Sequence, residues 1–224
     1  MEGSTGLKLN PHESTPREQA LLILVIIIFH VVGLIGFAVQ AMRPLFLEIV
    51  PWHMLLMLVV IVCSHRPMEG KFILFALIIF ICGVAFEWIG VHKNWIFGNY
   101  SYGATLGFKL AAIPLIIGVN WFLLIYSAGV LMQRTRIRSL FTRVVIGAAI
   151  LVLLDVIIEP VAQHFDYWHW KDSVIPLKNY LGWFLVSAVM LFVFEKFGFK
   201  KQSMVAPVLL VVQFVFFMVL FFLN

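Results

Sequence analysis

The chain has 224 residues, of which 62% are hydrophobic and only 12% are charged. Soluble globular domains carry about 25% charged residues, so this composition excludes an ordinary soluble domain. The 16 Lys and Arg residues outnumber the 11 Asp and Glu residues, but they are divided among the ends of apolar segments. Such a distribution does not indicate a nucleic-acid partner. The composition instead predicts an integral membrane protein.

Seven apolar segments follow a polar N-terminal tail, residues 1–18. Each is close to the roughly 20 residues that an α-helix needs to cross about 30 Å of hydrocarbon. We expect transmembrane helices at 19–40, 45–64, 72–92, 109–131, 142–163, 180–196 and 204–223. The expected fold is all-α, a polytopic bundle of about seven transmembrane helices in one transmembrane domain, 19–224. The two cysteines, Cys63 and Cys82, fall in different helices and are expected to be small core residues.

Basic residues are distributed unevenly between the two sides of this bundle. Eleven of the Lys and Arg residues flank the side that holds the N-terminus, and five flank the opposite side. Because basic residues concentrate in cytoplasmic segments, we expect a cytoplasmic N-terminus, an external C-terminus and a multi-pass location in the cell (inner) membrane. The run Arg134, Arg136 and Arg138 is expected to anchor this topology and to contact anionic lipid. The first helix is expected to be retained, because no small-residue cleavage site follows it.

Three carboxyl groups fall inside the expected helices, where a charge costs roughly 2.5–3.5 kcal/mol or more. Glu87 lies near the outer end of the third helix. Asp155 and Glu159 lie in the outer half of the fifth helix, and their spacing of four places them on one face. All three acids therefore approach the same outer side of the bilayer. The alternatives are that Glu159 lies at the wet interface, or that the acids form structural ion pairs with Lys109, Lys171 or Lys178.

Asp155 and Glu159 are the strongest candidates for chemistry. Two acids one turn apart in hydrocarbon cannot both ionise at low cost, so one of them is expected to hold a proton near neutral pH. A buried proton donor of this kind suits general acid catalysis. We expect Asp155, Glu159 and Glu87 to be the catalytic residues, with Asp155 or Glu159 as the donor and Glu87 orienting water or sharing the proton.

Aromatic residues crowd the loops on the same side. An aromatic belt at the membrane surface explains part of this enrichment. It does not explain the Gly, Asn and Pro residues interleaved with them in 94–103 and 166–183, which indicate ordered loops folded over a site. Aromatic faces also stabilise cations. The expected substrate-binding residues are Trp88, His92, Tyr100, Tyr102, Asn120, Trp121, Trp168, Trp170, Asn179 and Trp183.

Histidine patterns give little support for a metal site. The candidates form neither an HxxxH nor an HExxH pattern, and the acids lack a His three residues away, the spacing of membrane di-iron sites. These candidates are His53, His65, His92, His164 and His169. We expect no metal and no other cofactor.

Several short segments resemble one known family. They are EWIGV at 87–91, FGNYSY at 97–102, Leu106–Gly107 with Lys109, Ile113–Pro114, Asn120–Trp121, Asp155 with EPVA at 159–162, Trp168–Trp170, Ile175–Pro176, Asn179 and Gly182–Trp183. Over residues 50–195 their order and spacing resemble a carotenoid-biosynthesis membrane protein family. This family includes the carotenoid 1,2-hydratases of the bisanhydrobacterioruberin hydratase type.

The resemblance implies a polytopic helical membrane enzyme, a hydro-lyase without a metal or organic cofactor. Such an enzyme adds water across the terminal C1=C2 double bond of an acyclic carotenoid ψ-end. Protonation at C2 leaves a tertiary cation at C1, which water captures to give a 1-hydroxy end group. The implied partners are an acyclic, lycopene-like carotenoid, water, membrane lipid and neighbouring carotenoid-pathway enzymes, with no nucleic acid.

Two other functions fit the same residues. A lycopene-cyclase-type protein also protonates a ψ-end, but the cation then closes a ring instead of meeting water. In a proton-coupled transporter, Asp155 and Glu159 would relay protons, although no inverted repeat is visible. A retinal photoreceptor is excluded, because the last helix, 204–223, contains no lysine for a Schiff base.

Overall fold

The computed structural model describes residues 15–223, so most of the tail expected at 1–18 lies outside the described residues. Within this range the helices are α1 (Pro16–Ala38), α2 (Arg43–Glu48), α3 (Val50–Ser64), α4 (Gly70–Lys93), α5 (Ile116–Arg134), α6 (Leu140–His164), α7 (Leu177–Phe197) and α8 (Val205–Leu223). Six of them are long and apolar enough to cross a membrane, and α3 is a shorter apolar helix of 15 residues. The expected all-α membrane bundle is confirmed.

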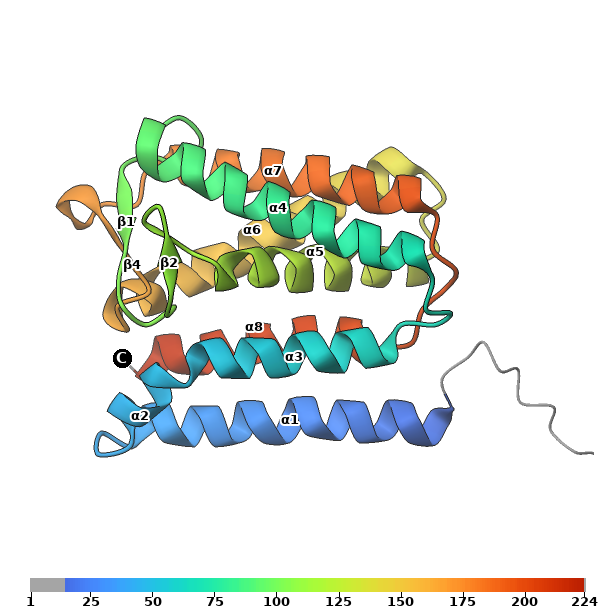
Figure 1. Ribbon diagram of the computed structural model, residues 1–224, viewed down its shortest axis with the longest axis horizontal. Coiled ribbons are helices and arrows are strands. Elements are labelled where there is room, and N and C mark those ends of the chain that lie inside the picture. The colour runs from blue at the N-terminus through green and yellow to red at the C-terminus, as the bar shows by residue number, and fades with distance from the viewer. Residues whose placement is uncertain (1–14, 224) are drawn as a thin grey trace, which may run out of the picture.

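The helices form two layers, which Figure 1 shows one above the other. Helices α4, α5, α6 and α7 pack together in one layer, and α1, α3 and α8 make the other with the short α2 at one end. Helix α5 is the centre of the molecule, because it contacts α3, α4, α6, α7 and α8. Fifteen of its 19 residues are buried. The polar groups on α5 therefore face protein rather than lipid.

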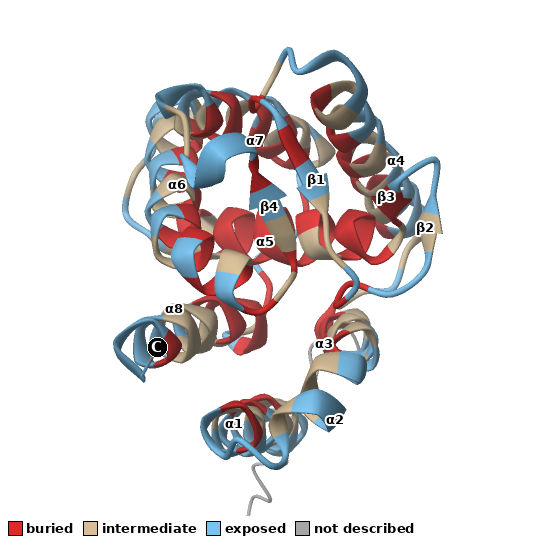
Figure 2. Cartoon of the chain, turned by 90° about the vertical axis from the view of Figure 1, so that its left-hand side faces the viewer, coloured by how far each residue is buried: buried red, intermediate tan, exposed pale blue. Residues whose placement is uncertain are grey.

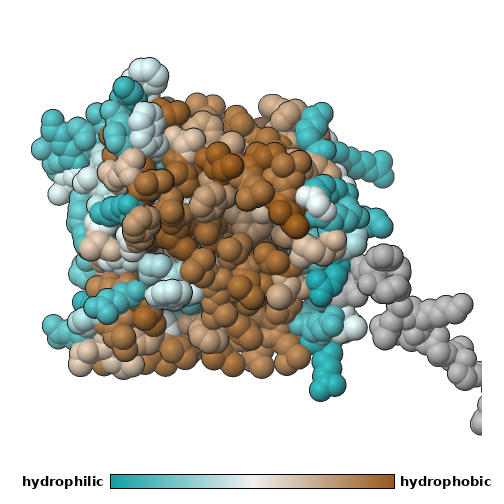
Figure 3. Space-filling model, in the orientation of Figure 1, coloured by the Kyte–Doolittle hydropathy of each residue, from teal (hydrophilic) through white to brown (hydrophobic). Residues whose placement is uncertain are grey.

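The outer surface of the bundle is apolar. On α7, Leu181, Leu185 and Val189 are exposed at a spacing of four, whereas Trp183 and Met190 on the opposite face are buried. This is the reverse of a soluble helix, whose exposed face is polar. Figure 3 shows the result as a hydrophobic band with hydrophilic residues at both ends. Such a surface suits lipid, so the protein is a membrane protein.

The two ends of the bundle differ. The start of α1 lies at one end with the turns that join α3 to α4, α5 to α6 and α7 to α8 (Figure 1). The strands and the end of α8 lie at the other end, called here the ribbon end. The basic residues that predict a cytoplasmic N-terminus lie at the first end, and the orientation across the membrane stays a prediction.

Some expected boundaries differ from the structure. The helix expected at 45–64 is divided at Ile49 into α2 and α3. The helix expected from 109 begins only at Ile116, because Lys109–Leu110 (β2) and Ile113–Pro114 (β3) form a small antiparallel hairpin. Its turn residues Ala111 and Ala112 have φ of 47° and 66°, which a right-handed helix does not allow. The cysteine prediction was wrong, since Cys63 is exposed and Cys82 is partly exposed.

A second strand pair closes the ribbon end. Strand β1 (Tyr100–Tyr102) pairs antiparallel with β4 (Trp168–Trp170), and the short 3₁₀ turn η1 (Lys171–Ser173) follows. Figure 2 shows this pair, called here the aromatic ribbon, lying across the end of the layer formed by α4–α7. Side chains alternate between the faces of a strand. Ser101 and His169 are accordingly exposed, while Tyr100 and Trp170 are buried.

Candidate active site

The aromatic ribbon places two tyrosine hydroxyls and two indole N–H groups within hydrogen-bonding distance of buried acids. The first acid is Glu87 on α4, which is 4% exposed. Its Oε2 accepts hydrogen bonds from the hydroxyls of Tyr100 and Tyr102, at 2.5 and 2.6 Å. Its Oε1 accepts from the indole Nε1 of Trp121 on α5, at 2.9 Å. Three donors converge on this carboxylate, which is the environment that stabilises a buried negative charge.

Glu159 on α6 has a parallel arrangement. Its Oε2 accepts from the indole nitrogens of Trp168 and Trp170, at 3.0 and 2.6 Å, and the side chain is 1% exposed. Its Oε1 accepts from the Asn179 amide on α7, at 2.8 Å. Each strand of the ribbon therefore serves one glutamate: the tyrosines of β1 hold Glu87, and the tryptophans of β4 hold Glu159.

Asp155 has a different environment, although it lies one turn from Glu159. Its Oδ2 accepts from the same nitrogen of Asn179, at 2.8 Å. Its Oδ1 is fully buried and has no hydrogen-bond partner among residues 15–223. A carboxyl with a single donor and a bare buried oxygen is poorly suited to a negative charge. Of the three acids, Asp155 is the one whose surroundings favour the protonated form.

The tyrosine hydroxyls must stay protonated to donate. Burial, followed by the negative charge of Glu87, raises the pKa of Tyr100 and of Tyr102 well above the ordinary range. Both hydroxyls are therefore fixed as donors at any physiological pH. The two rings lie edge to face, with centroids 5.7 Å apart.

The ion-pair alternative finds no support. Within the described chain, no Lys or Arg nitrogen lies within 4.0 Å of these three carboxyls, since the ion pairs present involve Glu69, Asp166 and Glu195. Lys109 donates instead to the Tyr102 carbonyl, and Lys178 donates to the Asn94 carbonyl. The acids are held by neutral donors.

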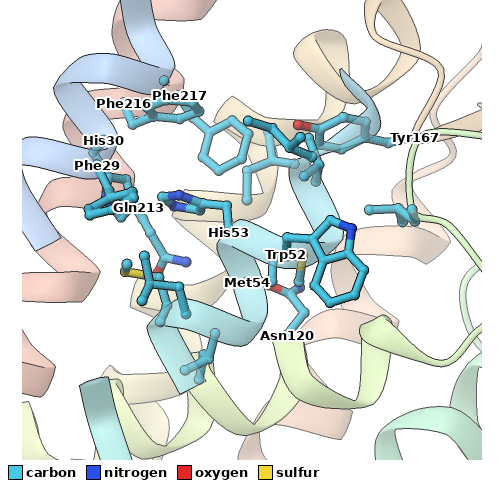
Figure 4. Close-up of a pocket in the computed structure, with 18 of the residues that line it drawn as sticks. Phe29, His30, Trp52, His53, Met54, Asn120, Tyr167, Gln213, Phe216 and Phe217 are labelled. Carbon is cyan, nitrogen blue, oxygen red and sulfur yellow. The ribbon is translucent and has the colours of Figure 1, made fainter. Parts of the chain in front are cut away.

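A cavity of about 420 Å³ lies beside this cluster, between the two helix layers (Figure 4). Trp168 lines the cavity and donates to Glu159, and Ile158 lines it next to that acid. Trp183 also lines the cavity and stacks on Trp121, with ring centroids 4.6 Å apart. Trp121 is one of the three donors to Glu87. The cavity is mostly apolar, and its size falls within the roughly 300–1,000 Å³ of small-molecule sites.

Comparison with known proteins gives the family. Residues 49–224, which hold the three acids, the aromatic ribbon and most of the cavity wall, match the carotenoid biosynthesis protein family. The chain belongs to this family. A relative, the bisanhydrobacterioruberin hydratase of Haloarcula japonica, is 29% identical over 138 residues. The match covers 58% of this chain and 46% of that relative, less than half of its length. No solved structure matches the chain significantly.

In this carotenoid biosynthesis protein, most of the residues expected at the site come together. Asn120 lines the cavity, and Trp121, Asn179 and Trp183 join the acids as described above. Two expected residues do not join them. Trp88 is 40% exposed, and its ring stacks on that of His92, which is also exposed. Both lie on the outer surface of α4, so the prediction that they line the site was wrong. They form an exposed stacked pair instead.

Sequence reasoning missed part of the cavity wall. His30 on α1 and Gln213 on α8 both line the cavity, and His53 on α3 does so too, although it was considered only as a metal ligand. The signal that could have found them is the one used for the acids, a polar side chain inside an apolar helix. Within residues 15–223, no three His, Cys, Asp or Glu side chains come together as potential metal ligands.

Proposed function

We propose that this protein is a carotenoid hydratase of the inner cell membrane, which adds water to the terminal C1=C2 bond of an acyclic carotenoid ψ-end. Membership of the carotenoid biosynthesis family and the similarity to a hydratase support this proposal. An acyclic carotenoid is an apolar molecule about 30 Å long, comparable to the thickness of the hydrocarbon layer, so it must reach the protein from lipid. The apolar outer surface (Figure 3) and the apolar cavity of the bundle suit such a substrate. The acid cluster lies at the ribbon end, because Glu87 and Glu159 bond to the side chains of the aromatic ribbon, and a membrane protein meets water at its ends.

The observation that carries the proposal is the unpartnered, buried Oδ1 of Asp155. Addition of water to an alkene begins with a proton, and the donor must be a neutral acid held away from bulk water. Glu87 and Glu159 each accept three hydrogen bonds, which favour the charged form of each, whereas Asp155 accepts one. Asp155 is thus the proposed proton donor.

The chemistry then follows in three steps. The Asp155 proton goes to C2, and the electron pair of the double bond forms the new C–H bond, which leaves a tertiary cation at C1. A water oxygen bonds to C1. One proton of the added water then returns to Asp155, directly or by way of Glu159, which makes Asp155 neutral again; one alkene and one water thus give one tertiary alcohol.

The surroundings suit the cation between these steps. In this proposal the carboxylates of Glu87 and Glu159, each held by three donors, lie near the cation, and preorganised groups stabilise a developing charge without reorganisation. The indole faces of Trp168 and Trp183 line the cavity beside them. Aromatic faces attract a desolvated cation by about 2 kcal/mol or more. Asn179, which donates to both carboxyl groups, would hold Asp155 and Glu159 at the spacing that proton transfer between them requires.

The proposal is tested by co-expressing the chain in a bacterium that makes lycopene and analysing the pigments by mass. A hydratase gives a product heavier by one water, with nearly unchanged polyene absorption, because C1=C2 lies outside the conjugated system. A ring-closed product of unchanged mass would mean a cyclase. No product at normal protein level, with lycopene and then with other acyclic carotenoids, would count against both enzymes and favour the transporter.

A further inference from the structure

The cavity contains a second group of polar side chains, away from the acids. His30, His53 and Gln213 come from α1, α3 and α8 and line the same cavity (Figure 4). The imidazoles of His30 and His53 meet edge to face, with centroids 4.7 Å apart. Phe216 also packs edge to face against His30, with ring centroids 5.6 Å apart. Three different helices thus bring hydrogen-bonding groups to one apolar space.

The tautomer of His30 follows from its geometry. Its Nδ1 lies 2.8 Å from the Ile26 carbonyl oxygen, which can only accept, so Nδ1 carries the proton. In the neutral ring the other nitrogen, Nε2, is then an acceptor. His30 is 5% exposed and touches a second imidazole, and no carboxylate within residues 15–223 is hydrogen-bonded to it. The neutral ring therefore presents an acceptor to its surroundings.

The other two side chains have atoms without a hydrogen-bond partner among residues 15–223. The Gln213 Oε1 is buried and has no hydrogen-bond partner within residues 15–223. The ring nitrogens of His53 likewise have no hydrogen-bond partner in this part of the chain. Buried polar groups in proteins are nearly always hydrogen-bonded, and the need is greater in a membrane, where water does not reach them freely. The buried Gln213 Oε1 therefore requires a partner that a ligand could supply, and the partly buried His53 lines the same cavity.

We propose that His30, His53 and Gln213 form a binding site for one hydroxyl group, carried into the cavity by an isoprenoid ligand. A hydroxyl donates one hydrogen bond and accepts up to two, so it can donate to Gln213 Oε1 or to His30 Nε2 while it accepts from the Gln213 amide nitrogen or the His53 ring N–H. The apolar remainder of the cavity matches an isoprenoid chain. The same hydroxyl chemistry could be supplied by a bound water, and the experiment separates these two sources.

This inference rests on the proposed function, from which it takes the isoprenoid ligand. It goes further in specifying that this ligand already carries a hydroxyl group. The cavity reaches from this hydroxyl site to Trp168 and Trp183 beside the acids. A ligand lying along it would present a double bond at one end while its hydroxyl is held at the other. The site would then select oxygenated isoprenoids over hydrocarbons of equal length.

The test measures binding rather than turnover. The purified full chain in detergent is titrated with two C15 probes, the alcohol farnesol and the hydrocarbon farnesene, by isothermal titration calorimetry. We expect roughly tenfold tighter binding of the alcohol, the effect of one or two hydrogen bonds. Gln213→Leu and His53→Phe should each bring this ratio close to one while the affinity for farnesene stays the same. His164→Phe is the matched control, because His164 is exposed outside the cavity, and it should keep the wild-type ratio.

The remaining outcomes are equally decisive. If the wild type shows no preference but both variants slow hydration in cells, the hydroxyl belongs to a bound water. If the ratio is one in the wild type and neither variant alters hydration, the hydroxyl site does not exist. Should Gln213→Leu fail to fold, Gln213→Met is the substitute, with nearly the same shape. A preference for farnesol in a chain that hydrates no carotenoid would uphold this site and overturn the proposed function.

Discussion

Asn179 donates to the Asp155 carboxyl across 2.8 Å, and this is the single hydrogen bond that the Asp155 carboxyl makes within residues 15–223. The same amide nitrogen also donates to Glu159. One amide on α7 therefore sets the spacing of two acids on α6. The arrangement keeps a neutral acid and an anion within one turn of each other, which is the combination that the proposed proton cycle requires.

The first prediction concerns the proton donor. Asp155→Asn should reduce hydration about 10²–10⁴-fold, the usual contribution of a general acid, because the amide keeps the shape but cannot supply the proton. Pigment conversion at equal protein level measures this. Glu159→Gln should also nearly abolish hydration, through loss of the anion that completes the proton cycle. The control is Asp172→Asn, an exposed position with φ of 57° that Asn tolerates, which should leave conversion unchanged. Wild-type conversion by both amide variants would make these acids structural.

The second prediction concerns Asn179. Asn179→Leu is close in size but removes the donor from Asp155 and one of three donors from Glu159. Loss of a partner from a buried polar group costs about 1–3 kcal/mol, so the variant should melt several degrees below the wild type in detergent and should not hydrate. Asn99→Leu, at an exposed position in the loop after α4, is the control. An unchanged melting temperature would show that Asn179 does not hold the acid pair.

The third prediction concerns the tyrosines. Tyr100→Phe and Tyr102→Phe each remove one hydrogen bond from Glu87, and a hydrogen bond to a charged group contributes about 1.5–3 kcal/mol. Each variant should therefore lower the melting temperature, and the double variant should lower it by a non-additive amount, since both hydroxyls share one carboxylate oxygen. Tyr180→Phe, which removes a hydroxyl outside this cluster, is the control. Strict additivity would mean that the two hydroxyls act on separate acceptors.

The fourth prediction concerns pH and the loop that precedes β4. The His169 hydrogen bond, followed by the Ala104 backbone N–H, lowers the pKa of Asp166 from its ordinary 3.8. A lowered pKa means that the stability contributed by this carboxylate is present above about pH 4 and is lost as the pH falls through the folded-state pKa. Wild type should therefore melt slightly above Asp166→Asn at pH 6, and the difference should shrink as the pH falls below the ordinary Asp pKa of 3.8 toward the lower folded-state value. His169→Gln removes the main cause and should move this loss to higher pH. A difference that is the same at both pH values would contradict the linkage.

The fifth prediction concerns orientation. Because 11 of the 16 basic residues flank the end that holds the start of α1, a reporter fused after Asn224 should lie outside the cytoplasm. An alkaline phosphatase fusion should be active and a green fluorescent protein fusion dark. The opposite pair of results would invert the bundle and place the acids near the cytoplasmic face.

The acids could be found from the sequence because hydrocarbon makes a buried charge expensive, so Glu87, Asp155 and Glu159 stand out wherever the helices pack. The aromatic ribbon could not be predicted from the sequence. Its strands are three residues long and are defined by a partner about 70 positions away. The same limit explains Trp88, which has the composition of the site but points outward, since the face of a helix that meets protein depends on its neighbours. His30 was missed because a search for charges passes over neutral polar groups.

The two strands of the ribbon hold each other through backbone pairing and hold one glutamate each through their side chains. A one-residue insertion or deletion that shifts the register of either strand would turn its aromatic side chains to the exposed face. The loops at 94–115 and 165–176 must therefore change together, so an exchange with a relative that moves only one of them should fail. An exchange of both loops as a unit gives protein engineers a way to alter the chemistry while leaving the lipid-facing helices untouched.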